Sequence, residues 1–118
     1  MPDFTDEERH EIACIARYHR RALPSTSHEE FAELSRRARK RVSALSAILR
    51  IADALDYSHD GRVLQLAPVP RRSDNSTWTI ALKIRPLADL DAELEHAYDK
   101  ADLFEKTFKR KLRLIIKD

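Results

Sequence analysis

The apolar residues in the first third of the chain recur with the spacing of helices. Thr5 followed by Glu8 predicts a capping box at the start of a first helix. The predicted apolar stripe of this helix consists of Ile12, Ile15, Ala16 and His19. Leu23-Pro24-Ser25 then predicts a break, and Ser27 with Glu30 predicts a second capping box that opens a short helix.

A long third helix is predicted from Arg36 to about Tyr57. Its apolar residues cover most of the circumference of a helical wheel, so we expect this helix to be central and buried. They are Val42, Leu45, Ile48, Leu49, Ile51, Ala52 and Leu55. The dipeptide Asp60-Gly61 predicts a turn at the end of the helix.

After Gly61 the apolar period changes from 3.6 to 2. The run from Val63 to Val69 predicts an edge strand, because Pro68 cannot donate a ladder hydrogen bond. Alternation from Thr77 to Arg85 predicts a half-buried strand. A helix after Pro86 is predicted to carry the stripe Leu90, Leu94, Ala97, Ala101 and Phe104. A last strand is predicted to place Leu112, Leu114 and Ile116 on one face, with Lys111, Arg113 and Lys117 mostly on the other.

This order of elements, α-α-α-β-β-α-β, predicts an α+β fold. Residues 1–60 form the predicted helical part, and residues 61–118 form a ββαβ part with a three-stranded sheet. We expect the two parts to pack together as one domain, since the chain has 118 residues.

Composition narrows the possible functions. The chain has one cysteine, Cys14, which excludes an internal disulfide and favours a cytoplasmic location. It has one glycine, Gly61, so the glycine-rich loops that hold nucleotide phosphates are excluded. No stretch of about 20 apolar residues predicts a membrane span. The net charge is +2, but it results from blocks of opposite sign that largely cancel.

Two histidines and an aspartate are candidate metal ligands. His19 ends the stripe of the first helix, which favours a partly buried imidazole bonded to a backbone carbonyl. The alternative is a divalent metal site made by His19, His28 and Asp53, although a divalent ion usually requires a fuller shell. No cofactor is expected on the first interpretation.

Two aspartates of the third helix raise a question of burial. Asp56 is predicted within the apolar face of the helix and Asp53 at its border. Buried carboxylates are costly unless they are paired. The favoured interpretation is therefore a structural network that links Asp53 or Asp56 to Arg50, His19 or Arg20.

Five cations crowd the start of the third helix, where they oppose the helix dipole. Two ways of neutralising these cations are open. One is pairing with Glu29, Glu30 and Glu33 of the preceding short helix. The other is a phosphate-rich ligand such as polyphosphate; nucleic acid is disfavoured, because no aromatic residues interleave with the cations. The predicted phosphate-binding residues are Arg20, Arg21, Arg36, Arg37, Arg39, Lys40 and Arg41.

Four segments of the sequence resemble one known family. They read IACIARYHRRALP at residues 12–24, SHEEF at 27–31, AILRIADALD at 47–56 and KADLFE at 100–105. The chain resembles the C-terminal region of the exopolyphosphatase / guanosine pentaphosphate phosphohydrolase family. The resemblance implies a helical part related to the His-Asp metal phosphohydrolases, which helps to form dimers and a basic channel for polyphosphate. Catalysis in this family is implied to reside in an N-terminal half with an actin-like fold.

The resemblance also marks what we expect to be missing. We expect the catalytic half to be absent, and only Asp53 corresponds to the metal-site pattern of the His-Asp enzymes. The leading hypothesis is a non-catalytic module that binds polyphosphate and forms a homodimer or docks onto a phosphatase catalytic half. The alternatives are a minimal metal-dependent phosphohydrolase that uses His19, His28 and Asp53, and an adapter for a separate catalytic subunit.

Overall fold

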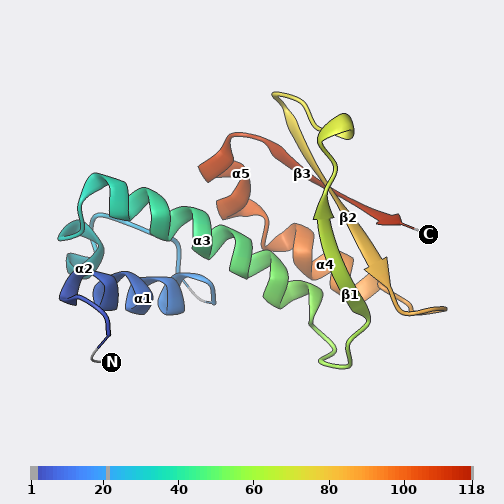
Figure 1. The fold of residues 1–118 in the computed structure, drawn as a ribbon, viewed down its shortest axis with the longest axis horizontal. Coiled ribbons are helices and arrows are strands. Elements are labelled where there is room, and N and C mark those ends of the chain that lie inside the picture. Colours follow the sequence, from blue (N-terminus) through green and yellow to red (C-terminus); the bar gives the residue numbers. More distant parts are fainter. Residues whose placement is uncertain (1–2, 21, 118) are drawn as a thin grey trace. The chain divides into compact units, whose positions relative to one another are not determined.

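The computed structural model describes residues 3–20 and 22–117, which divide after Arg50 into two compact units. We refer to the described residues up to Arg50 as the first unit and to those from Ile51 as the second unit. The helices are α1 (Asp6–Tyr18), α2 (Glu29–Ala32), α3 (Arg36–Leu55), α4 (Asp91–Asp99) and α5 (Asp102–Phe108) (Figure 1). The strands are β1 (Val63–Pro68), β2 (Thr77–Ile84) and β3 (Lys111–Lys117), with a short 3-10 helix, η1 (Pro70–Arg72).

These elements confirm the predicted α+β fold, with helices first and a three-stranded sheet after them. The packing of residues 1–60 and 61–118 as one domain stays a prediction. No helix of the described residues is long and apolar enough to cross a membrane.

Helix α1 begins as the sequence predicts but buries a different face. Thr5 Oγ1 accepts a hydrogen bond from Glu8 N at 3.1 Å, and Glu8 Oε1 accepts one from Thr5 N at 2.9 Å, which confirms the capping box. The predicted stripe is wrong in phase, since Ile12 and Ala16 are exposed. The buried residues are Glu11, Cys14 and Tyr18.

The core of the first unit forms around Tyr18, which has no exposed surface. Its partners in this core are Cys14, Phe31, Leu34, Ala38 and Val42. The Tyr18 ring meets Phe31 edge-on at 5.6 Å between centroids. Burial raises the pKa of the Cys14 thiol, which disfavours the reactive thiolate form.

The second predicted capping box does not form. Helix α2 starts at Glu29 after His28, which makes no side-chain capping bond, whereas Ser27 N donates to Ser25 Oγ at 3.1 Å. His28 instead joins α2 to α1, because its Nδ1 lies 2.6 Å from the Tyr18 hydroxyl. A tertiary hydrogen bond to a buried tyrosine has replaced the local cap that the sequence pattern indicates.

Helix α3 follows its predicted bounds to within two residues, but it is not buried all round. Ala38, Val42 and Ala47 are fully buried. Leu45, Ile48 and Leu49 retain exposed fractions of 45%, 49% and 42%. They lie at i, i+3 and i+4, so they form one apolar stripe on the surface of the first unit.

The second unit is built on a sheet of order β1-β2-β3. Strand β1 pairs antiparallel with β2, and β3 pairs parallel with β2. Strand β1 is therefore an edge strand, as Pro68 predicts. Gly61 precedes β1 with a positive φ of 71°, a backbone conformation that glycine adopts without steric cost.

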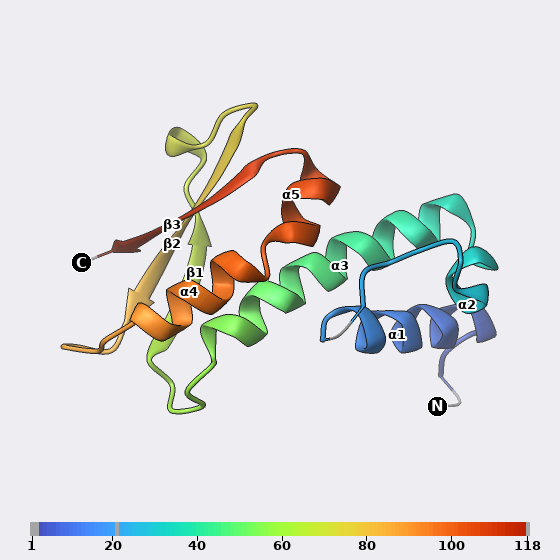
Figure 2. The same ribbon diagram turned by 180° about the vertical axis from the view of Figure 1, so that it is seen from behind.

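Helices α4 and α5 cover one face of this sheet (Figures 1 and 2). Trp78 of β2 packs edge-on against Phe104 and Phe108 of α5, at 5.8 and 5.4 Å between ring centroids. The Tyr98 hydroxyl of α4 accepts a hydrogen bond from Leu114 N at 2.8 Å. The single helix predicted after Pro86 is thus two helices, and both lie on the Trp78 face.

The Leu82→Ala substitution is expected to lower the free energy of unfolding by about 2–5 kcal/mol, since the side chain has no exposed surface and a cavity would remain. Urea titration followed by the fluorescence of Trp78, the only tryptophan, measures the loss. Ile116, the register partner of Leu82, is 49% exposed and provides the control. Ile116→Ala should change the free energy by about 0.5 kcal/mol or less, and equal losses in both variants would contradict this packing.

Candidate functional site

The first turns of α3 present the basic surface that the sequence predicts. Arg36, Arg37 and Lys40 are exposed and Arg39 is partly exposed, whereas Ala38 is fully buried. Side chains at i, i+3 and i+4 are neighbours on a helix, so these four cations lie close to one another. We call these four residues the α3 basic cluster.

No ion pair neutralises the α3 basic cluster within residues 3–20 and 22–117. The predicted partner Glu30 of α2 instead lies 3.8 Å from Arg17 of α1. Like charges at this spacing repel one another, and they also oppose the positive end of the helix dipole. The local backbone support comes from Ser35, whose Oγ accepts a hydrogen bond from Ala38 N at 3.1 Å.

Arg41, the next cation along α3, is already engaged. Its guanidinium donates from Nε to Glu11 Oε1 at 2.8 Å and from Nη2 to Glu11 Oε2 at 3.1 Å. This two-point hydrogen bond raises the pKa of Arg41 and explains why an acidic residue can be buried on α1. A role of Arg41 in binding phosphate stays a prediction, and binding there would compete with Glu11.

The two remaining predicted phosphate ligands lie after α1. Arg20 is exposed, and its Nε donates to His19 Nε2 at 3.3 Å. Arg21 lies outside the described residues. The neighbouring His19 is partly buried, and its Nδ1 lies 3.0 Å from the backbone oxygen of Ile15, which confirms the expected carbonyl bond.

The three candidate metal ligands are His19, His28 and Asp53, and the structure shows the surroundings of each. His19 bonds to a carbonyl and His28 bonds to Tyr18, both in the first unit. Asp53 is an exposed residue at the end of α3, in the second unit. Within the part of the chain that the structure describes, no group of three or more His, Cys, Asp or Glu side chains could hold a metal ion.

The expectation of buried aspartates on α3 is wrong. Asp53 and Asp56 are both exposed, and Asp56 lies 3.3 Å from His59 Nδ1 rather than in a buried network. Arg50, a predicted partner, donates to the backbone oxygen of Tyr18 at 3.1 Å. Exposure removes the need for pairing on which that interpretation depends, because water solvates the carboxylates.

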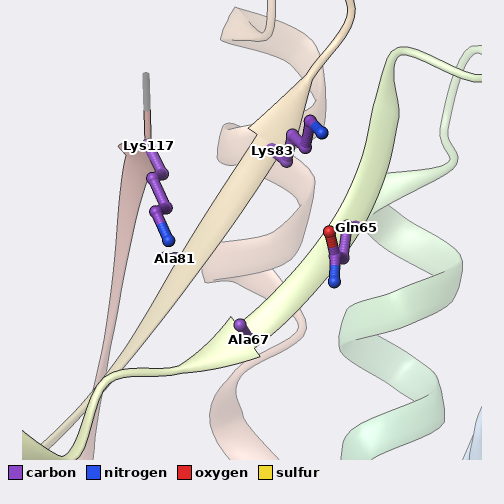
Figure 3. A pocket seen from close by; sticks show the side chains of 5 residues that line it. All are labelled: Gln65, Ala67, Ala81, Lys83 and Lys117. Atoms are coloured by element: carbon purple, nitrogen blue, oxygen red, sulfur yellow. The ribbon is translucent and has the colours of Figure 1, made fainter.

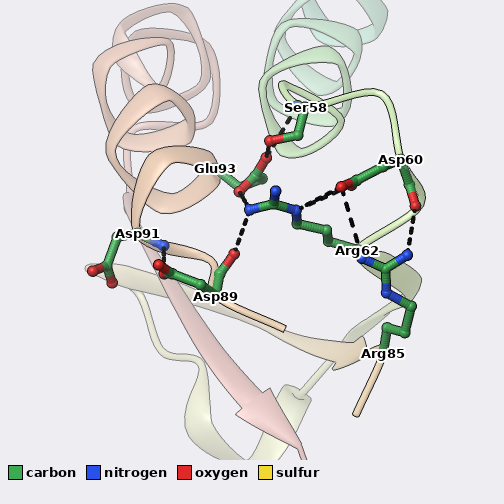
Figure 4. Close-up of polar contacts among 7 residues, drawn as sticks. All are labelled: Ser58, Asp60, Arg62, Arg85, Asp89, Asp91 and Glu93. Carbon is green, nitrogen blue, oxygen red and sulfur yellow. Dashed lines mark hydrogen bonds and ion pairs between the residues drawn. The ribbon is translucent and has the colours of Figure 1, made fainter. Parts of the chain in front are cut away.

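Among the described residues of the second unit, the buried carboxylate is Glu93 of α4, with 1% of its surface exposed (Figure 4). Its Oε2 accepts hydrogen bonds from the Ser58 hydroxyl and, at 3.0 Å, from Ser58 N. Its Oε1 lies 3.8 Å from Arg62 Nη1. The bonds from Ser58, with a smaller contribution from Arg62, lower the pKa of Glu93.

Arg62 extends this network to the loop after α3. Its Nε donates to Asp60 Oδ2 at 2.9 Å, and its Nη1 donates to the backbone oxygen of Asp89 at 3.0 Å. Arg85 reaches the same carboxylate, with Nη2 3.7 Å from Asp60 Oδ2. The hydrogen bond from Arg62 lowers the pKa of Asp60. The loop after α3 is therefore linked to α4 by hydrogen bonds and ion pairs between opposite charges.

Sequence reasoning missed both buried carboxylates, although the pattern contains a signal for each. Glu11 stands three residues before Cys14 and seven before Tyr18, which places it on the buried face of α1. Glu93 likewise stands three residues after Leu90 and four before Ala97. An acidic residue in phase with buried apolar residues predicts a buried ion pair or hydrogen-bonded carboxylate.

Comparison with models of known protein families gives a match. The profile described as Ppx/GppA phosphatase, domain III matches residues 1–99. The match includes the α3 basic cluster, Glu11 and Glu93. A search among curated proteins found no match to the sequence.

The Glu93→Gln substitution is expected to destabilise the second unit by about 1–3 kcal/mol at neutral pH, because it disrupts the hydrogen bonds of a buried carboxylate. The lowered pKa of Glu93 means that its stabilisation is present above the unfolded pKa of about 4.3 and is lost as the pH falls through the folded value. Urea titrations of Trp78 fluorescence across acidic and neutral pH measure both effects.

The matched control for this prediction is Glu95→Gln, an exposed position of the same helix. This variant should keep the stability of the parent protein and its decline in acid. A Glu93→Gln variant that declines in acid as steeply as the parent would contradict the proposed contribution of the buried carboxylate.

Proposed function

The chain belongs to the Ppx/GppA phosphatase family, and we propose that it acts there as a polyphosphate-binding and self-associating module that does not itself hydrolyse phosphate bonds. The supporting observation is the α3 basic cluster. Four cations stand within the first five residues of one helix without an ion pair in the described residues. A ligand with closely spaced negative charges would relieve their mutual repulsion.

A linear phosphate polymer fits this cluster better than nucleic acid does. Single-stranded nucleic acid is held by cations together with aromatic side chains on which the bases stack. In the first unit, Tyr18 and Phe31 are buried in the core, and Phe4, which is 40% exposed, precedes α1 and does not interleave in sequence with the cations of α3. Polyphosphate requires only the cations, because it carries no bases.

The proposed lack of hydrolysis is supported by the position of the one glycine of the chain. Gly61 lies in the turn between α3 and β1, and it is exposed. Phosphate-holding loops of the nucleotide-dependent kind need several glycines close together. The rival is a minimal metal-dependent phosphohydrolase, which stoichiometric bound metal and phosphate release abolished by Asp53→Asn would support.

Self-association is supported by the stripe of Leu45, Ile48 and Leu49 on α3. Each of these side chains is at least 42% exposed, and exposed apolar stripes of this kind often mark interaction surfaces. A second copy of the chain can cover the stripe with its own identical stripe across a two-fold axis. An adapter that docks onto a separate catalytic subunit would use the same surface with a different partner.

Replacing Arg36 and Lys40 together by Gln is expected to weaken polyphosphate binding about 3- to 10-fold at low salt. The affinity of the parent protein should fall steeply with salt, and that of the variant less steeply, because fewer counterions are released. Titration calorimetry over a range of salt concentrations measures both quantities. The variant should be at least as stable as the parent, since like charges at the start of a helix are removed.

The control for this experiment is the double replacement of Lys100 and Lys106 by Gln, which removes the same net charge from the second unit, at the turn after α4 and on α5. Equal weakening by both pairs would show a dependence on net charge alone, which contradicts a role for the cluster. Undetectable binding by the parent at low salt would refute the proposed ligand. Steady release of phosphate from polyphosphate by the purified chain would refute the absence of hydrolysis.

The Ile48→Asp substitution is expected to convert a dimer into a monomer, because it places a charge in the centre of the apolar stripe. Sedimentation equilibrium over a wide concentration range measures this, and circular dichroism checks that the helices remain. Ile12→Asp provides a matched control on the exposed side of α1, where the side chain is 39% exposed. A parent chain that stays monomeric at every concentration would contradict self-association.

A further inference from the structure

The second unit has a sheet face that α4 and α5 do not cover. The register places Gln65, Lys83 and Lys117 in one row across the three strands. The next row on the same face is Ala67, Ala81 and Ile115. The helices pack on the opposite face, where Trp78 contacts Phe104 and Phe108. The two faces therefore differ in chemistry, with aromatic packing on one and long polar side chains on the other.

Small side chains make this face hollow at its centre. Ala67 and Ala81 form the floor, and the longer side chains of Gln65, Lys83 and Lys117 surround it (Figure 3). The hollow has a volume of about 210 Å³. Since a water molecule occupies about 30 Å³ in the liquid, this volume admits a group larger than a single solvent molecule.

A second hollow continues from the first along the face. It shares Ala67, Ala81 and Lys117 with the first hollow and extends to Arg71 and Arg72 of η1. Its volume is about 480 Å³. Lys83 lines the first hollow, Arg71 and Arg72 line the second, and Lys117 lines both, so cations border the whole of this surface.

Among the residues that the structure describes, the cations of this surface have no acidic partner. Within the ranges 3–20 and 22–117, neither Lys83, Lys117, Arg71 nor Arg72 forms an ion pair. Lys111 of β3 shows the contrast, because its Nζ lies 3.3 Å from Glu105 Oε1. The strand residues are thus unneutralised where they surround the hollow and neutralised at the start of β3, next to α5.

We propose that this face is a second binding surface for a linear phosphate polymer, with Lys83 in the first hollow, Arg71 and Arg72 in the second, and Lys117 lining both. This inference rests on the proposed function, and it adds a site that is separate from the α3 basic cluster. Polyphosphate is favoured over single-stranded nucleic acid because the aromatic residues of the sheet and of α5 lie on the opposite face.

The residues of this face would make different kinds of contact with the polymer. The ammonium groups of Lys83 and Lys117 act as compact charges that attract phosphate oxygens. Gln65 can donate from its amide to one of these oxygens. The guanidiniums of Arg71 and Arg72 can bind further phosphates in a two-point manner. The alanine floor matters because larger side chains at Ala67 or Ala81 would fill the space that the polymer occupies.

The test compares three double variants of the full chain in titrations with long-chain polyphosphate at low salt. Replacing Lys83 and Lys117 by Gln is expected to weaken binding about 3- to 10-fold, comparable to the replacement of Arg36 and Lys40. The replacement of Lys100 and Lys106 should have little effect. A further single variant, Ala81→Leu, keeps every charge and should weaken binding because the larger side chain fills the hollow. Urea titration followed by Trp78 fluorescence checks that the sheet of this variant remains folded.

Each outcome separates this inference from the proposed function. Weakening by the α3 pair alone overturns the sheet surface and leaves the proposed function intact. Weakening by the sheet pair alone supports the sheet surface and overturns the α3 basic cluster as the binding site. Absence of binding by the parent chain overturns both. Tighter binding of a single-stranded oligonucleotide of equal charge, lost on removal of Lys83 and Lys117, overturns the choice of polyphosphate as ligand.

Discussion

Two buried carboxylates of this protein each take up an arginine that would otherwise be available to a ligand. Glu11 in the first unit and Glu93 in the second are each buried, and each must be compensated. Glu11 engages Arg41 through two hydrogen bonds, and Glu93 engages Ser58 with Arg62 nearby. The cations outside these contacts include the four of the α3 basic cluster and those around the sheet hollow. The cations that pair with carboxylates of the fold can therefore be distinguished from the cations that a ligand could bind.

This distinction explains why the near-neutral net charge is a poor guide to the chain. Acidic residues that would balance the cations are partly used elsewhere, as with Glu30, which lies near Arg17. Others, such as Asp53, are solvated and exposed. Positive charge consequently remains concentrated at two places in the structure, one in each unit. A phosphate polymer is a ligand whose repeating charge suits such places.

Patterns that depend on neighbouring residues allowed much of the fold to be predicted. The Thr5–Glu8 capping box, the long α3, the edge position of β1 and the alternation of β2 and β3 all follow from local spacing. The predicted single helix after Pro86 failed at Lys100 and Ala101, where the chain turns between two short helices that both pack on the sheet. Apolar periodicity continued through this turn, so the pattern alone contained no sign of the break.

What the sequence did not reveal depends on contacts between distant residues. The buried face of α1 was predicted wrongly because the prediction followed apolar residues alone, whereas the buried face includes Glu11. The pairing of Glu11 with Arg41, thirty residues later, compensates for its burial. Likewise, His28 bonds to Tyr18 where a local Ser27 cap was expected. The α3 basic cluster could be found from composition, whereas the hollow in the sheet needs the register that places Lys83 beside Lys117.

The central claim is that polyphosphate binds the cations that do not pair within the fold. Its most direct test is the chemical acetylation of lysines with and without polyphosphate, quantified at each site by mass spectrometry. Lys40, Lys83 and Lys117 should be protected by the polymer, whereas Lys100, Lys106 and the Glu105-paired Lys111 should react equally in both conditions. Uniform protection of all lysines, or protection of none, would contradict the account.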